Sequence, residues 1–237
     1  MTDSNQKKGK KQKVERMFND IAPRYDFLNH FLSMGIDIQW RKTVRKTLAP
    51  LKPKKILDVA TGTGDLAIEL SKLKPESIIG VDIAEEMLNV GKKKIKKKKL
   101  DNIISMEVGD SENLRFNDHT FDAVTVAFGV RNYEDLQKGL KDMRRVLKPG
   151  AMVAILEFSK PKSFPFKNIY NLYFNFLLPT FGKAVSSHDS AYTYLPESVQ
   201  SFAEDEAFIK EMEKAGYKNC KQKRLTFGIS TLYTGTA

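Results

Sequence analysis

The sequence has almost no cysteine, no long apolar run and no apolar leader, and each absence excludes a class of protein. Cys220 is the only cysteine, which leaves no disulfide framework and no metal-ligand cluster. No apolar run approaches the roughly 20 residues that cross a bilayer. Residues 1–13 are polar and rich in lysine, unlike a secretory signal. We therefore expect a cytoplasmic protein that holds no metal.

Acidic residues are too few to balance the lysines, and the formal net charge is +11. Five lysines lie within residues 1–13 and seven within residues 92–99, and these twelve exceed the whole surplus. The rest of the chain is close to neutral, which argues against a basic groove for nucleic acid. The two clusters have two interpretations: a flexible tail and a solvated helix end, or surfaces attracted to an anionic membrane.

Apolar runs alternate with helical patterns from Lys54 to Phe158, and turn residues separate them. The strands are expected at Lys55 to Ala60, Ser77 to Ile83, Ile104 to Gly109, Phe121 to Phe128 and Met152 to Phe158. The helices between them are expected at Asp65 to Lys72, Ala84 to Lys98 and Tyr133 to Leu147. This series predicts an α/β fold with a mostly parallel, doubly wound sheet, whose ligand crevice lies at the carboxyl ends of the strands.

The segments outside this core predict a helical cap and a C-terminal antiparallel hairpin on one domain spanning residues 14–237. Residues 1–13 are expected to be a flexible tail, 14–50 a helical cap, 54–160 the cofactor-binding core, 161–203 a substrate-cap insertion and 204–237 a helix and hairpin. Helices are expected at Val14 to Ala22 and Asp37 to Leu48. Between residues 166 and 181 the apolar residues follow one helical face, which indicates either packing on the sheet or a wall for a hydrophobic substrate.

A glycine turn between a strand and a helix is the strongest local signal. Gly62-Thr63-Gly64 follows the first strand, and Asp82 ends the next, where a carboxylate can accept both ribose hydroxyl protons. Glycine suits a sharp turn that presses against a ligand. The third glycine of a nicotinamide-binding motif is missing. S-adenosylmethionine has no pyrophosphate, and its amino acid suits a loop with the Thr63 hydroxyl and nearby carboxylates.

The third strand ends in a second polar pair, Asp110-Ser111. Asp110 can accept the adenine amino hydrogens while the Ser111 backbone meets the ring. The alternative role for Asp110 is a helix N-cap or turn residue.

Several motifs in order along the chain resemble the class I S-adenosylmethionine-dependent methyltransferases, and more narrowly the C-methyltransferase family of menaquinone and ubiquinone biosynthesis. They are Met17 to Asn29, Gly35 to Arg41, Asp58 to Asp65, Ala127 to Asn132, Leu147 to Gly150, Leu156 to Pro161 and Tyr192 to Ser198. The resemblance implies C-methylation of demethylmenaquinol, or of the benzoquinol precursor of ubiquinone. It implies cofactor contacts from Gly62, Thr63, Gly64, Asp82, Asp110, Ser111 and Ala127. Ala60 departs from the glycine that many methyltransferases carry at this position.

Methyl transfer from a sulfonium to a ring carbon requires alignment, exclusion of water and a phenolate on the acceptor. Arg131, beside Asn132, can stabilise that phenolate or orient a water that accepts the proton. Its alternative role is a surface ion pair with Glu134 or Asp135. Asn132 and Tyr25, the latter from the cap, are the further catalytic candidates. The substrate candidates are Asp26, Asn29, Tyr192 and Tyr194. The alternative role of the aromatic residues among them is packing within the cap.

Other functions remain as alternatives at this point. A nucleic-acid methyltransferase lacks support, because Phe128 to Asn132 replaces the Asn/Asp-Pro-Pro-aromatic motif and no Pro-Cys nucleophile is present. A cofactor-binding scaffold without catalysis would transfer no labelled methyl group to a lipid extract. Methylation of a sterol or phospholipid amine would be distinguished by competition between quinol and phospholipid acceptors. We expect a prenylated quinol and an anionic membrane surface, reached transiently from the cytoplasm, as partners. No feature of the sequence indicates an oligomeric state.

Overall fold

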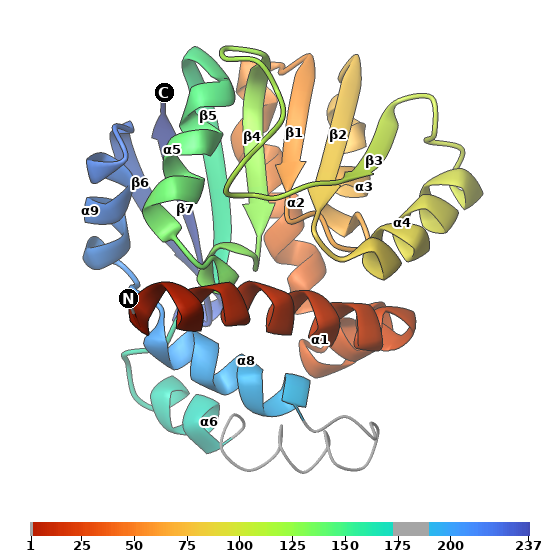
Figure 1. The fold of residues 1–237 in the computed structure, drawn as a ribbon. Coiled ribbons are helices and arrows are strands. Elements are labelled where there is room, and N and C mark those ends of the chain that lie inside the picture. The colour runs from red at the N-terminus through yellow and green to blue at the C-terminus, as the bar shows by residue number, and fades with distance from the viewer. Residues whose placement is uncertain (1, 173–189) are drawn as a thin grey trace.

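The computed structural model describes residues 2–172 and 190–237, which build a seven-stranded sheet in the order β3-β2-β1-β4-β5-β7-β6. The first five strands of this order are parallel, and β7 pairs antiparallel with both β5 and β6 (Figure 1). The strands are β1 (Lys55–Val59), β2 (Ser77–Asp82), β3 (Ile104–Val108), β4 (Phe121–Ala127), β5 (Leu147–Phe158), β6 (Lys218–Leu225) and β7 (Ser230–Thr236). The predicted fold class and the terminal hairpin are confirmed.

Helices cover both faces of the sheet, as the near-continuous apolar strands require. The helices α5 (Leu136–Val146) and α9 (Glu206–Lys214) bury Leu140, Met143 and Phe208 against one face. The helices α2 (Ile36–Leu48), α3 (Asp65–Leu70) and α4 (Glu85–Lys97) pack on the other face. The hydrophobic core therefore lies in two layers, one on each side of the sheet.

Local sequence signals explain where these helices begin and end. Glu85 and Glu86 lie in the first turn of α4 and three lysines lie in its last turn, which complements the helix dipole. Asp135 is the N-cap of α5, and its side chain accepts a hydrogen bond from the Lys138 backbone N–H at 3.0 Å. The helix expected from Tyr133 therefore begins only at Leu136, after a 3-10 turn at Val130–Asn132.

Three further helices lie at the end of the sheet where the parallel strands finish (Figure 1). They are α1 (Thr2–Leu32), α6 (Phe166–Leu172) and α8 (Ser190–Ser201). Helix α1 packs against both α4 and α8. These helices form a cap over the position where the βαβ topology places a ligand crevice.

The N-terminal region differs from the expectation of a flexible tail and a helix limited to Val14 to Ala22. One helix runs from Thr2 to Leu32 and passes through Pro23. Its basic segment has long-range partners: Lys10 donates to the Tyr133 carbonyl at 2.7 Å, and Lys11 forms an ion pair with Asp110. Contacts over such a sequence separation leave no trace in local composition, which is why this segment was predicted as a tail.

The strand β5 begins earlier than expected. Leu147 already pairs with Phe121, and the register shifts before the regular pairing that begins at Met152. The sequence Lys148-Pro149-Gly150, between the predicted helix end at Leu147 and the predicted strand start at Met152, lies within an irregular extension of the strand. Of the predicted aromatic helix, residues 166–172 form α6, and the rest lies outside the described residues, as does part of the 161–203 insertion.

Candidate functional site

The loop after β1 has a backbone that is left-handed at three positions. The φ angles are +50° at Ala60, +56° at Gly62 and +79° at Gly64. Glycine adopts this region freely, whereas alanine adopts it at a cost. A Cβ added to Gly129 would lie 2.6 Å from the Ala60 Cβ, so the two loops touch closely. The predicted glycine turn is thus a tight loop pressed against the end of β4.

Asp58, in β1, stabilises this loop through its buried carboxylate. Its carboxylate accepts hydrogen bonds from the hydroxyls of Thr61 at 2.6 Å and Thr125 at 2.7 Å, and the side chain is almost completely buried. Burial raises the pKa of Asp58 from 3.8 to about 6, although both hydroxyl donors oppose the shift. The folded protein therefore binds a proton at Asp58 more tightly than the unfolded chain does.

The free energy of unfolding should depend on pH through Asp58. Because the folded pKa is raised, ionisation favours the unfolded chain, and stability decreases as the pH rises from about 4 to about 6. Relative to the Asp58→Asn variant, we expect the wild type to lose about 1 kcal/mol between pH 5 and pH 7. Thermal or urea unfolding of both proteins at the two pH values measures this, and a difference independent of pH would contradict it.

Asp82, at the end of β2, binds the backbone of the same loop. One carboxylate oxygen accepts the Gly62 N–H at 2.8 Å, and the other accepts the Ala84 N–H at 2.9 Å. Burial raises the pKa of Asp82, while these backbone donors lower it. The predicted ribose ligand is therefore also the residue that joins the glycine loop to the start of α4.

A cleft opens beside this loop, which we call the glycine-loop cleft. Seven residues predicted for the site line it: Tyr25, Gly62, Asp82, Asp110, Ser111, Ala127 and Asn132. Further lining residues were not predicted: Lys11, Val14, Phe18, Ala60, Ile83, Met87, Glu112, Phe128, Gly129 and Tyr133. The unpredicted members are largely apolar and come partly from α1, so α1 forms one wall of the cleft.

Asp110 has two partners in the structure. One carboxylate oxygen accepts the Glu112 N–H at 2.9 Å, which is the turn role that we considered as its alternative. The other pairs with Lys11 of α1. Ser111 and Tyr133 both line the cleft. The lysine thus lies at the carboxylate that was predicted to receive the adenine amino group.

Removal of the Lys11 side chain should strengthen cofactor binding, since Lys11 competes for Asp110. The pair is partly exposed, and such pairs contribute less than about 1 kcal/mol, so we expect at most about a five-fold decrease in the Kd for S-adenosylmethionine in Lys11→Ala. Isothermal titration calorimetry measures this, with Lys13→Ala as the control because Lys13 is exposed on the same helix. Weaker binding by Lys11→Ala would show that Lys11 assists the cofactor instead.

Thr63 and Asp26, predicted as cofactor and substrate residues, contact each other. The Thr63 hydroxyl donates to Asp26 at 2.5 Å, and Lys94 of α4 donates to Asp26 at 2.6 Å and to Asp65 at 2.5 Å. Asp65 also lies 3.5 Å from the His30 ring. This polar network ties α1 and α4 to the glycine loop, and Lys94 was not predicted as part of it.

Arg131 forms a buried ion pair with a residue that the sequence analysis missed. Its Nη1 lies 2.7 Å from Oε1 of Glu157 in β5, and the side chains are 6% and 0% exposed. The guanidinium also donates to the Phe128 carbonyl and lies 5.3 Å from the centre of the Phe158 ring. Burial raises the pKa of Glu157, and Arg131 opposes that shift. The surface pair with Glu134 or Asp135 that we considered is not formed.

Three of the other predicted residues, Tyr25, Asn132 and Tyr194, lie near this pair. The Tyr194 hydroxyl donates to the Asn132 side-chain oxygen at 2.9 Å, which joins α8 to the end of β4. Burial raises the pKa of Tyr25, so its hydroxyl keeps its proton at neutral pH and can donate a hydrogen bond. Tyr192 lies in α8, but its side chain lies outside the described residues.

These residues fit S-adenosylmethionine. A buried carboxylate at the end of β2 suits a ribose, and the apolar side chains of Val14, Phe18 and Met87 suit an adenine ring. A Cβ on Gly62 would lie 3.2 Å from the end of Met87, so that position leaves little room for a side chain. The cleft combines one polar edge with apolar walls, as a nucleoside requires.

Comparison with known proteins gives consistent matches. Residues 6–237 match the model of the ubiE/COQ5 methyltransferase family. The chain is 49% identical to the demethylmenaquinone methyltransferase of Bacteroides fragilis, over 96% of this chain and 93% of that protein. It is 46% identical to the ubiquinone/menaquinone biosynthesis C-methyltransferase UbiE of Geotalea daltonii, over 95% and 97% of the two chains.

Solved structures are similar in fold at lower identity. A methyltransferase from Thermotoga maritima, described as a possible histamine N-methyltransferase, matches with a TM-score of 0.65 and 19% identity, over 93% of this chain and 98% of that one. A Haemonchus contortus phosphoethanolamine N-methyltransferase with bound S-adenosylmethionine matches with a TM-score of 0.56 and 16% identity, over 77% and 48%. At this identity the structures support the class I methyltransferase fold alone.

Proposed function

The chain belongs to the ubiE/COQ5 methyltransferase family and depends on S-adenosylmethionine, and from this premise we propose that it methylates a ring carbon of demethylmenaquinol to give menaquinol. The observation that supports this acceptor most directly is the 49% identity to a demethylmenaquinone methyltransferase over nearly the whole chain.

The cofactor supplies an electrophilic methyl group on a sulfonium, and the protein supplies position and environment. Gly62, Gly64 and Asp82 hold the nucleoside, while Thr63 and Ala127 flank its amino-acid end. The cap helices exclude water, which strengthens every polar contact inside the site. Because the ring carbon becomes nucleophilic when the acceptor phenol loses its proton, the site must favour a phenolate.

We assign the stabilisation of that phenolate to Arg131. Its pairing with Glu157 compensates the charge of the guanidinium, which therefore contributes directed N–H donors instead of an unpaired cation. The Tyr25 hydroxyl, kept protonated by burial, is a further donor toward the acceptor oxygen. Asn132 is held by Tyr194, so the cap and the catalytic end of β4 are aligned together. Asp26, Asn29, Tyr192 and Tyr194 are proposed to enclose the acceptor.

The benzoquinol precursor of ubiquinone is the second candidate acceptor, because the UbiE relatives carry both pathways in their name. Purified protein is incubated with labelled S-adenosylmethionine and either chemically reduced demethylmenaquinol or the benzoquinol, and the lipids are extracted for mass analysis. One added methyl on the naphthoquinol supports the proposal. Labelling of the benzoquinol alone would transfer the assignment to the ubiquinone pathway, and labelling of neither would refute the acceptor class.

We further propose that the protein works at the cytoplasmic face of an anionic membrane, where a prenylated quinol resides. No helix of the described residues combines the length and the apolar character needed to cross a bilayer. The net charge of +11 favours attraction to anionic lipid. Contact with the membrane would therefore be peripheral and transient.

A further inference from the structure

We propose that an exposed aromatic surface formed by Phe164, Phe166 and Phe227 is the part of the protein that docks on an anionic lipid bilayer. We call it the Phe164 surface. This inference rests on the proposed function, because the Phe164 surface would be the face through which the enzyme reaches an acceptor held in the membrane. The side chains of this surface take no part in methyl transfer itself.

Two of the three aromatic side chains of this surface are largely exposed, and Phe166 is partly buried. Phe164 is 82% exposed and Phe227 is 64% exposed. The Phe227 ring stacks on the Phe166 ring, with centroids 3.7 Å apart and planes 6° from parallel. Large apolar side chains gathered in this way on a surface indicate a binding site for an apolar partner.

The backbone that presents Phe227 is strained, which argues against a chance exposure. Thr226 and Phe227 have φ angles of +44° and +56°, a region that β-branched and bulky residues avoid. The Thr226 hydroxyl accepts a hydrogen bond from Trp40 Nε1 at 2.8 Å, which fixes the turn to α2. The structure therefore holds an aromatic ring in solvent at an energetic cost.

Basic residues lie close in sequence to the three rings. Lys160, Lys162 and Lys167 flank Phe164 and Phe166, and Lys223 and Arg224 precede Phe227. Lys162 and Arg224 pair with Asp205 at 2.6 and 2.5 Å, and Lys160 pairs with Glu204 at 3.5 Å. The salt bridges of the described residues do not include Lys167 or Lys223, and both are exposed. An aromatic centre bordered by lysines matches the interfacial region of an anionic bilayer.

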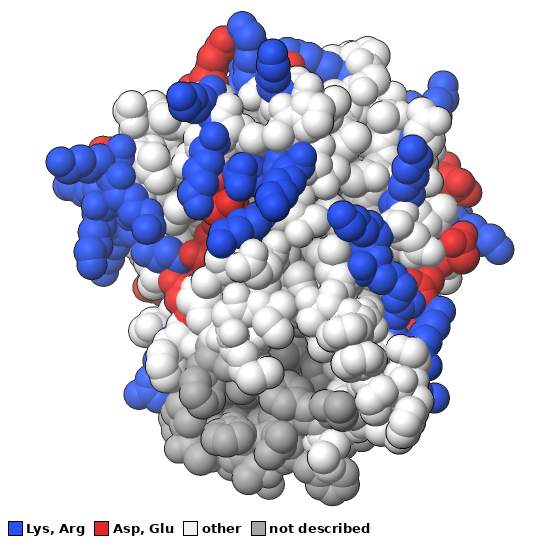
Figure 2. Space-filling view, turned by 180° about the vertical axis from the view of Figure 1, so that it is seen from behind, with Lys and Arg blue, Asp and Glu red and all other residues white. Residues whose placement is uncertain are grey.

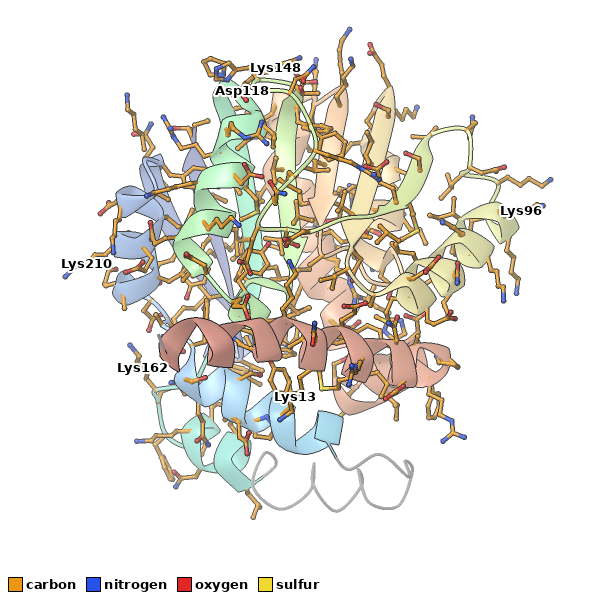
Figure 3. The ribbon with its side chains drawn as sticks, in the orientation of Figure 1. Lys13, Lys96, Asp118, Lys148, Lys162 and Lys210 are labelled. Atoms are coloured by element: carbon orange, nitrogen blue, oxygen red, sulfur yellow. The ribbon has the colours of Figure 1, made fainter. Side chains whose placement is uncertain are left out.

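The charge distribution over the molecule agrees with this placement. In Figure 2 the lower part of the visible face, at the end of the sheet that carries α6 and α8, is mostly white among the described residues, with blue atoms at its sides. Figure 3 places Lys162 at this end, and Lys96 of α4 at the side of the molecule. Lys96 therefore lies away from Lys162, which is two residues from Phe164 in the sequence.

Aromatic packing connects the Phe164 surface to the glycine-loop cleft. Phe128, which lines the cleft, lies 4.5 Å from Phe158, and Trp40 lies 6.0 Å from Phe158, between ring centroids. Trp40 in turn bonds to Thr226, beside Phe227. A protein docked through this surface would place the cleft close to the bilayer, so that the ring of the acceptor enters the site while its prenyl tail remains in lipid.

The test measures sedimentation of the full-length protein with vesicles of phosphatidylglycerol and phosphatidylcholine. Binding to phosphatidylglycerol vesicles should fall about ten-fold or more in the double variant Phe164→Ser, Phe227→Gly, because the apolar area available for insertion is lost. Glycine is suited to the positive φ at position 227. Leu51→Ser is the matched control, since Leu51 is a 48% exposed apolar residue preceding β1, at the opposite end of the sheet.

A second readout separates this inference from the proposed function. Methylation of a short-chain, water-soluble demethylmenaquinol analogue should be unchanged in the double variant, while methylation of the prenylated quinol in vesicles should decrease. If the wild type binds vesicles and the double variant binds equally well, or if Lys96→Glu with Lys97→Glu abolishes binding instead, the Phe164 surface is refuted. If the wild type methylates no quinol of either kind, the proposed function fails while the binding result still stands.

Discussion

Replacement of Arg131 by glutamine is expected to decrease kcat for the quinol by about 100-fold to 1,000-fold, the range found when one donor to a developing oxyanion is removed. The variant should also lose about 3–5 kcal/mol of unfolding free energy, because Glu157 would remain buried without its partner. Kinetics under saturating cofactor and urea unfolding measure the two effects.

A double variant separates the catalytic effect from the structural one. In Arg131→Met with Glu157→Leu both charges are removed, so the unfolding free energy should return to within about 2 kcal/mol of the wild type. The kcat should remain low because no N–H donor has been restored. Recovery of kcat together with stability would show that Arg131 is structural and would contradict the role proposed for it.

Replacement of Asp82 by alanine is expected to raise the Kd for S-adenosylmethionine at least about 100-fold, since two effects combine. The ribose loses a charged acceptor, and the Gly62 and Ala84 N–H groups lose the carboxylate that orders the glycine loop. Calorimetric titration of the cofactor measures the change. Asp82→Asn retains the size of the side chain, and we expect it to bind more weakly than the wild type but better than the alanine variant.

Asp122 provides a matched control for Asp82. Its carboxylate accepts the backbone N–H groups of Lys54 at 3.0 Å and Lys55 at 2.8 Å, at the amino end of β4 and far from the cleft. Asp122→Ala should therefore lower stability without changing the Kd of the cofactor. Equal weakening of cofactor binding by the two alanine variants would mean that Asp82 acts through global stability alone.

The parallel strands were predictable because their sequence is apolar on both faces and bounded by turn residues. For β1 to β4 the observed ends differ from the predicted ones by one residue. The left-handed backbone at Gly62 and Gly64 was likewise implied by the residue type. Such properties are local, and local sequence is sufficient to indicate them.

The partners that complete the site were harder to predict, because they join distant segments. Lys11 and Asp110 are separated by 99 positions, and nothing in the composition of residues 1–13 indicates this pair. Glu157, by contrast, could have been recognised from the sequence, because it is an acid within an apolar strand. A buried acid requires a partner, and Arg131 is that cation.

Lys94 could also have been recognised from its position in the helix. It lies seven residues after Met87 and three after Gly91, both buried in α4, and so shares their face. A charged residue on a buried face differs from the solvated lysines around it. The composition of the lysine run alone does not indicate that Lys94 binds Asp26 and Asp65.

The position of β7 in the sheet also affects how the chain is synthesised. This strand lies between β5 and β6, although it follows both in the sequence. Until residues 230–236 have left the ribosome, the apolar strand β5 exposes an open edge that can pair with another nascent chain. The cofactor loop belongs to strands that are complete much earlier, so the segment that protects the nascent protein from aggregation is made well after the segment that binds the nucleoside.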